Sequence, residues 1–166
     1  MRPLRCSRAL AIKSQWAMDG GQPKNFIRSS PESSRELAVG DRLEVAKEIL
    51  QMATEELERG RKMRQNFLLR NSADKAFLAV VQAVNDAVKA KLGKVPLNHS
   101  ERRRFLRDWG REDLRAEYSD LMKDLHEDCF YTGIIDEEVI DAAFKKAGEF
   151  IAKIAKLEAQ EHNPDK

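Results

Sequence analysis

The feature that most constrains the fold is a three- and four-residue spacing of apolar side chains, which begins just after Asp41 and continues almost to the C-terminus. Side chains at this spacing form a stripe along one face of an α-helix, and the stripe must be buried against other helices. Short connections that contain glycine, proline or asparagine interrupt the pattern, and such residues end helices. No segment keeps the strict alternation of a half-buried strand over a useful length. The sequence therefore predicts an all-α fold.

These interruptions divide the pattern into five predicted helices. They cover about 41–59, 72–92, 99–109, 111–131 and 137–158, and the third is short. Residues 60–71 are predicted to be a basic connection with at most an extra helical turn. Residues of the types that cap helices stand at the predicted ends, namely Asp41, Asn98 and Asp136 at N-termini and Gly60, Gly93, Gly110 and Gly133 at C-termini. Because short connections make consecutive helices antiparallel, we expect an up-down bundle of four long helices plus one short helix.

Charge divides the chain near residue 40. Residues 1–40 contain seven basic and three acidic residues, and residues 41–166 contain twenty-three basic and twenty-five acidic residues. The net charge of +2 is therefore the sum of +4 and −2. This predicts a flexible or irregular basic arm over 1–40, a helical bundle over 41–160 and a frayed tail over 161–166. Met18 is an alternative natural start of the chain.

Composition and motifs exclude several classes of protein. No apolar run approaches the ~18 residues of a membrane-spanning helix, so we expect no membrane partner. Cys6 and Cys129 stand alone, which is typical of a reducing compartment, and we expect a cytoplasmic protein. Metal-ligand spacing, Gly-rich phosphate loops and nucleophile elbows are absent from the sequence, so we expect neither metal nor cofactor. The charge balance of the helical body makes nucleic acid an unexpected partner for the folded domain.

The densest group of reactive side chains lies between Leu125 and Gly133. It contains His126, whose imidazole titrates near neutral pH and is the natural acid–base candidate. Tyr131 follows in the same segment, and Arg115 precedes it on the same side of the predicted helix. We take His126, Tyr131 and Arg115 as candidate catalytic residues. The alternative is a structural histidine near a helix end, where the helix dipole favours its charge.

Two further residues are candidate ligand-binding residues together with His126. Asp128 lies in the same segment, and Asn85 interrupts an apolar row on the predicted 72–92 helix. A buried amide needs a hydrogen-bond partner, so Asn85 is placed to orient His126 or a neighbouring helix. The alternative is an amide at the edge of the core, which is the commoner position for asparagine.

Charged side chains form two opposed clusters within the helical body. Arg102, Arg103 and Arg104, with Arg107 and Trp109 after them, are typical of a nucleic-acid-binding patch. Three consecutive residues do not share one helix face, however, and nearby acidic residues favour a solvated helix with internal ion pairs. The region 117–141 is strongly acidic. If the fold brings it near the basic 59–64 turn, the two regions balance each other.

The order of elements resembles the HEPN superfamily of helical bundles. The resemblance rests on Glu58-Arg59-Gly60 at the end of the first helix, the alanine-rich segment Ala73–Val84, Leu125-His126-x-x-Cys129-Phe130-Tyr131-x-Gly133, and Asp136–Val139. Within the superfamily the chain is similar to an archaeal paralogous-repeat branch whose members share a Leu-His-x-x-Phe-Tyr-x-Gly helix end. Here an additional residue separates His126 from Phe130. The resemblance covers about 41–158.

This resemblance implies two classes of function. Ribonucleases and toxins of the superfamily carry Arg, four to six residues, then His, and no arginine stands at that distance before His99, His126 or His162. The other class contains non-catalytic modules that dimerise, bind nucleotides or pair with a nucleotidyltransferase. We therefore expect a non-catalytic interaction module that forms a homodimer and binds a nucleotide or a partner protein. The alternative is a ribonuclease or a toxin–antitoxin component with an atypical site around His126, so enzymatic activity is left open.

Overall fold

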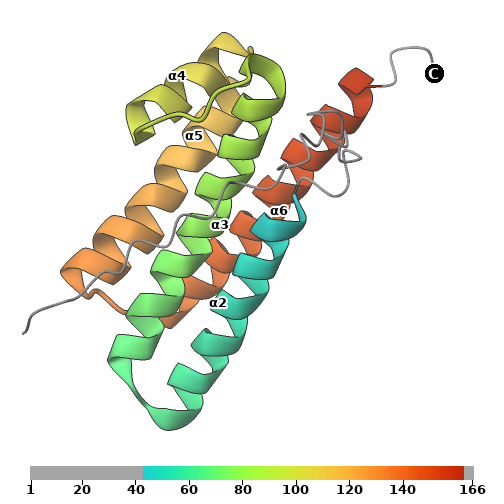
Figure 1. Ribbon diagram of the computed structural model, residues 1–166. Helices are drawn as coiled ribbons and strands as arrows, with labels where there is room; N and C mark the ends of the chain where they lie inside the picture. The colour runs from blue at the N-terminus through green and yellow to red at the C-terminus, as the bar shows by residue number, and fades with distance from the viewer. Residues whose placement is uncertain (1–42, 163–166) are drawn as a thin grey trace, which may run out of the picture. The chain divides into compact units, whose positions relative to one another are not determined.

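A computed structural model describes residues 43–162, and helices make up nearly all of this range (Figure 1). The helices are α2 (Glu44–Met63), α3 (Asn66–Leu92), α4 (His99–Asp108), α5 (Glu112–Leu121), the π-helix η1 (Met122–Thr132) and α6 (Glu137–His162). The described residues contain no strand, so the all-α prediction is confirmed. The predicted arm and the cap Asp41 lie outside the described residues. The predicted tail begins too early, because α6 continues to His162.

The connection between the first two helices is much shorter than predicted. Helix α2 continues past Gly60 to Met63 and ends at Arg64, which has the left-handed φ of 52°. Helix α3 then starts at Asn66, six residues earlier than expected, and its first turn buries Leu68 and Leu69. Gly60 allows α2 and α3 to pack closely, because a Cβ at this position would lie only 3.0 Å from Cβ of Leu68.

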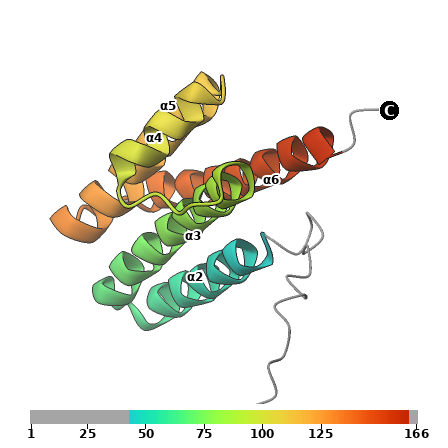
Figure 2. The same cartoon turned by 45° about the horizontal axis from the view of Figure 1, so that its top comes forward.

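Helix α3 is the central element of the fold. It contacts α2, α4, α6 and η1, and it lies between α2 and the α4–α5 pair in Figure 2. A helix surrounded in this way must be apolar on most of its circumference. Its buried positions include five alanines without exposed surface, which allow neighbouring helices to approach closely: Ala73, Ala76, Ala79, Ala83 and Ala87.

The predicted caps of the later helices are confirmed. Oδ1 of Asn98 accepts a hydrogen bond from the Glu101 amide (2.9 Å), and Oδ1 of Asp136 accepts from the amides of Glu138 (3.0 Å) and Val139 (3.2 Å). Gly133 follows η1 in the left-handed conformation, with φ of 75°. These signals are local, which explains why sequence patterns find them.

The predicted 111–131 helix is continuous but changes its register at Met122. In η1 the backbone hydrogen bonds join residues five apart, so side chains at i and i+5 become neighbours. Nζ of Lys123 accordingly lies 2.9 Å from Oδ2 of Asp128. Arg70 holds the end of this helix to α3, because its Nε donates to the Phe130 carbonyl (2.9 Å).

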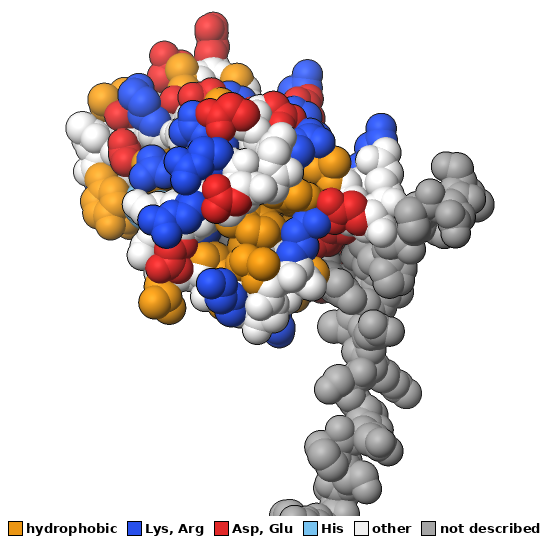
Figure 3. Space-filling view, turned by 90° about the horizontal axis from the view of Figure 1, so that it is seen from above, with side chains coloured by type: hydrophobic (Ala, Val, Ile, Leu, Met, Phe, Trp, Pro, Cys, Tyr) orange, Lys and Arg blue, Asp and Glu red, His pale blue; other side chains and the backbone are white. Residues whose placement is uncertain are grey.

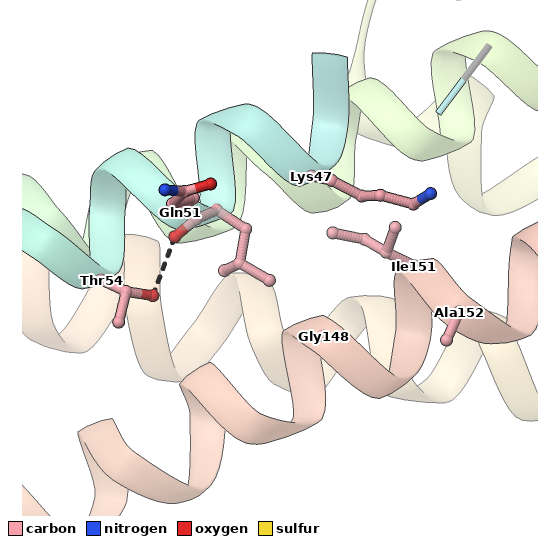
Figure 4. Close-up of a pocket in the computed structure, with 7 residues that line it drawn as sticks. Lys47, Gln51, Thr54, Gly148, Ile151 and Ala152 are labelled. Carbon is pink, nitrogen blue, oxygen red and sulfur yellow. Dashed lines mark hydrogen bonds between the residues drawn. The ribbon is translucent and has the colours of Figure 1, made fainter. Parts of the chain in front are cut away.

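Several apolar residues that continue the helical spacing are exposed. Val45, Met52 and Val139 flank their helices' buried stripes and retain about half of their accessible surface (50%, 54% and 44%). Helices α2 and α6 leave a hollow of about 380 Å³ between them, where Gly148 and Ala152 present almost no side chain (Figure 4).

The two opposed charged regions of the helical body do meet. Nη2 of Arg61 lies 2.6 Å from Oδ1 of Asp141, and Nε of Arg61 lies 3.7 Å from Oε2 of Glu137. These contacts join the basic end of α2 to the acidic start of α6. The expectation that the basic turn and the acidic region balance each other is therefore confirmed for this part of the fold.

Candidate acid–base site

Two histidines from different helices meet on one side of α3. His99 is the first residue of α4, His126 lies in η1, and their ring centroids are 6.0 Å apart. Both rings pack on Phe77 of α3, at centroid distances of 5.5 Å and 5.3 Å. The buried phenyl ring therefore forms a floor that fixes the separation of the two imidazoles.

His126 is oriented by a carboxylate. Its Nδ1 lies 2.6 Å from Oδ1 of Asp74, one turn before Phe77 on α3. An ionised carboxylate only accepts hydrogen bonds, so Nδ1 carries a proton and Nε2 of the neutral ring has a free lone pair. The carboxylate also offsets positive charge that forms on the ring when Nε2 takes up a proton. His126 is thus arranged as a proton acceptor.

His99 has the opposite arrangement. Its Nδ1 lies 2.7 Å from the hydroxyl of Tyr118, which is fully buried. Burial raises the pKa of Tyr118 to about 12, even though the charge of Arg102 acts to lower it, so the phenol keeps its proton. That hydroxyl donates to Nδ1 of His99, which leaves the proton of the neutral ring on Nε2. His99 is thus arranged as a hydrogen-bond donor.

The second nitrogen of each ring is open. Neither Nε2 has a hydrogen-bond partner within residues 43–162. Neither is among the atoms that are both unpartnered and buried, so neither is shielded from water. Both atoms therefore reach solvent. A bound molecule can meet an acceptor on His126 and a donor on His99 at the same time.

The surroundings of His99 favour its neutral form. Burial lowers the pKa of His99 below its ordinary value, the positive charges of Arg102, His126 and Arg103 lower it further, and Glu127 opposes this. Protonation would add another positive charge beside the two arginines. His99 is therefore neutral at pH 7.

This shift predicts how stability depends on pH. The pKa of His99 is lower in the folded than in the unfolded chain. The contribution of His99 to the free energy of unfolding is therefore complete above the pKa of the unfolded chain, about 6.5, and is lost as the pH falls through the pKa of the folded chain. We expect the wild-type free energy of unfolding to fall more steeply than that of His99→Gln between pH 7 and pH 5. Urea unfolding at several pH values measures both. Parallel curves for the two proteins would contradict the assignment.

Two arginines make the site positive. Arg102 is buried; its Nε donates to Oδ1 of Asn85 (2.8 Å) and its Nη2 to the carbonyl of Pro96 (3.3 Å). Neither Arg102 nor Arg103 forms an ion pair with any carboxylate in the described part of the chain. Both act on His99 and Tyr118 through their charge. A buried cation without a counter-ion is costly, and an anionic ligand would compensate it.

The π-helical register adds an aromatic ring to the site. Tyr131 stands five residues after His126, and its ring meets the imidazole edge-on at a centroid distance of 4.8 Å and an angle of 81°. In an α-helix, residues five apart point in different directions. Tyr131 is also well exposed (67%), so its other surface faces solvent beside the two imidazoles.

The structure brings some of the predicted site residues together and places others elsewhere. His126 and Tyr131 are neighbours, but Asn85 holds Arg102 of α4 and does not contact His126. Nε of Arg115 donates to Oε1 of Glu112 (2.6 Å) on the surface. Asp128 pairs with Lys123, also on the surface. Nothing joins Arg115 or Asp128 to the histidine pair, so their assignment to this site is not supported.

Sequence patterns did not bring four members of the site together: Asp74, His99, Arg102 and Tyr118. Arg102 stood out only as part of an arginine cluster, and His99 is the first residue of the predicted 99–109 helix, but α4 folds back so that His99 faces His126. One signal was available. Asp74 and Asn85 are polar, lie eleven residues apart and hence share one otherwise apolar face of α3. That face is the one on which the site is built.

The thiol of Cys129 is not available as a nucleophile. Cys129 of η1 is buried, and burial raises the pKa of its thiol, so it stays protonated. Residues 43–162 contain no group of three or more His, Cys, Asp or Glu side chains arranged to hold a metal ion. The arrangement therefore offers proton transfer, hydrogen-bond donation and positive charge.

Comparison with protein-family models, with curated proteins and with solved structures finds no match for this chain. In the described part of the chain, no helix has both the length and the apolar character needed to cross a membrane. The function must therefore be argued from the chemistry of the site.

Proposed function

We propose that the chain is an acid–base ribonuclease in which the 2′-hydroxyl of the substrate is the nucleophile. The observation that carries this proposal is the histidine pair, in which His126 offers an acceptor, His99 offers a donor and the two ring centroids lie 6.0 Å apart, beside two arginines without carboxylate partners. It takes up the alternative that the HEPN resemblance implies, with a site that lacks the usual arginine–histidine motif. The expected non-catalytic module becomes the second candidate.

The charges favour a phosphate group as the part of the substrate held in the site. Arg102 provides a buried positive charge and Arg103 a guanidinium free to form hydrogen bonds with phosphate oxygens. The helical body as a whole is slightly acidic, which argues against nucleic acid. At the site itself, however, Arg102 and Arg103 act on His99 through their positive charge, and this local charge favours a phosphate there.

RNA carries its own nucleophile, the 2′-hydroxyl, and therefore suits a site that offers a proton acceptor, a hydrogen-bond donor and positive charge. Nε2 of His126 takes the proton of the 2′-hydroxyl, and O2′ attacks the adjacent phosphorus as the bond to O5′ breaks. The leaving O5′ takes a proton from water, and His126 later returns its proton to solvent. Nε2–H of His99 and the guanidinium of Arg103 donate to the non-bridging oxygens as their charge increases. The products are a 2′,3′-cyclic phosphate and a 5′-hydroxyl.

For the fold we propose the antiparallel up-down bundle of the HEPN type. In it α2, α3, α6 and the continuous α5–η1 are the four long helices and α4 is the short one. Support comes from the two-residue connection between α2 and α3, the short turn before α6, and the order of elements. An archaeal origin, a cytoplasmic location and a toxin–antitoxin role belong to the same proposal.

Self-association is the second candidate function. Leu78 lies one helical turn after Asp74 on α3, and both Leu78 and Tyr131 expose large apolar surface (49% and 67%) next to the histidine pair. Exposed apolar side chains grouped on one face are typical of an interface. A homodimer, a nucleotidyltransferase partner or a bound nucleotide are the forms of this function that the resemblance implies.

The experiment that tests the ribonuclease proposal uses the full chain and labelled single-stranded RNA. We expect cleavage that leaves 2′,3′-cyclic phosphate ends, no cleavage of DNA of the same sequence, and a block wherever a single 2′-deoxy nucleotide replaces a ribonucleotide. RNA that stays intact, or DNA that is cut equally, would refute the proposal. Light scattering on the same sample tests the second candidate: a strict monomer contradicts self-association, and a dimer without cleavage supports it.

A further inference from the structure

A second pocket lies where α3 ends and α4 begins. It has a volume of about 490 Å³, which falls within the range of small-molecule sites. Val88 and Phe105 form a buried floor. Leu92, Val95 and Leu97 line it while remaining more than half exposed (55%, 52% and 87%). Three large apolar side chains exposed around one hollow indicate a surface that a ligand covers.

Four charged side chains also line this pocket, and two of them are already engaged. Oε2 of Glu101 accepts from the Leu97 amide (2.8 Å), and its Oε1 lies 3.4 Å from Nδ2 of Asn98. Oδ1 of Asp108 lies 3.5 Å from Nε of Arg107. The other two, Lys94 and Arg104, have no hydrogen bond or ion pair within residues 43–162. The charge left free to bind a ligand is therefore positive.

Figure 3 views the molecule from this end and shows hydrophobic side chains exposed among Lys and Arg side chains. The four pocket-lining residues of α4 (Glu101, Arg104, Phe105 and Asp108) share one side of that helix. His99 and Arg103 lie on the opposite side. The pocket is therefore distinct from the acid–base site and does not depend on the function proposed for that site.

We propose that this pocket binds a small amphipathic anion, with an apolar body between Leu92, Val95 and Leu97 and a single carboxylate head held by Lys94 and Arg104. The apolar body covers side chains that are otherwise exposed to water. The carboxylate gives both free cations a partner, and Arg104 offers the two parallel donors that match a carboxylate. A cationic or neutral head would leave these cations without a partner.

Isothermal titration of the full chain with three probes tests this proposal: decanoate, decyltrimethylammonium and decanol, each below its aggregation concentration. We expect decanoate to bind with one molecule per chain and the other two to bind at least tenfold more weakly. The variant Lys94→Gln/Arg104→Gln should weaken decanoate binding about tenfold or more, because hydrogen bonds to charged groups contribute about 1.5–3 kcal/mol.

The matched control is Lys89→Gln, which removes an exposed positive charge from α3 at a position that does not line the pocket and whose side chain forms no hydrogen bond or ion pair within residues 43–162. It should bind decanoate as the wild type does. Leu97→Ser, at a nearly fully exposed position, should fold normally and bind all three probes more weakly. Equal binding of the three probes, or decanoate binding unchanged in Lys94→Gln/Arg104→Gln, would overturn the proposal. Cleavage of RNA by these variants is expected to be unaffected, so the two proposals fail independently.

Discussion

Replacing His126 with alanine is expected to lower the rate of RNA cleavage by about 10²–10⁴-fold, the usual contribution of a general base. The loss should fall on kcat, because the imidazole acts on the proton that moves in the transition state. The fold should persist, since His126 is only half-buried and Asp74 becomes free to meet water. Single-turnover cleavage of labelled RNA measures the rate, and thermal unfolding checks the fold.

Two variants separate catalysis from structure. Asp74→Asn keeps the size of the side chain but no longer obliges Nδ1 of His126 to carry the proton, so it should lose part of the activity. Arg115→Ala removes a residue that pairs with Glu112 on the surface, and it should cleave at the wild-type rate. A His126→Ala protein with full activity would refute the role of the base. Equal losses in all three variants would indicate general destabilisation.

Removing the buried charge of Arg102 is expected to lower activity strongly without weakening the fold. In Arg102→Met/Asn85→Leu both partners of the 2.8 Å hydrogen bond become apolar. Buried charged groups replaced by apolar residues of similar size often leave stability unchanged or raise it by about 1–4 kcal/mol. Loss of the charge that stabilises the phosphate in the transition state should reduce cleavage by about 10²–10³-fold.

Urea unfolding and RNA cleavage of the same sample measure these two effects. The single variant Arg102→Met should be measured beside the double variant. It leaves Asn85 without its hydrogen-bond donor, so its free energy of unfolding should be lower than that of the double variant by about 1–3 kcal/mol. A double variant that is clearly destabilised but still active would contradict the assignment of Arg102 to the site. Higher stability with lower activity would show that the buried cation is kept for function.

The parts of the fold that depend on neighbouring residues in the chain could be predicted from the sequence. Asn98 and Asp136 cap helices through amides two or three residues away, and Gly93 and Gly133 end helices through their own backbone freedom. The end of α2 could not be predicted in this way. A glycine can end a helix or allow a close helix contact, and only the position of α3 shows that Gly60 does the latter.

The candidate site was predicted only where its members are close in sequence. His126 and Tyr131 belong to one segment, so their chemistry is visible there. The pairs His126–Asp74 and His99–Tyr118 join residues 52 and 19 positions apart, and they form only because α3, α4, α5 and η1 pack together. The tautomers follow from those contacts. No pattern in the sequence indicates which nitrogen of either ring faces solvent.

The π-helical register of η1 has a consequence for the number of residues that this helix can hold. A π-helical turn accommodates one residue more than an α-helical turn. The three residues between His126 and Phe130, from Glu127 to Cys129, all lie in the stretch that the structure widens, while Gly133 still closes the helix. The segment 122–132 can therefore hold an additional amino acid without breaking the helix.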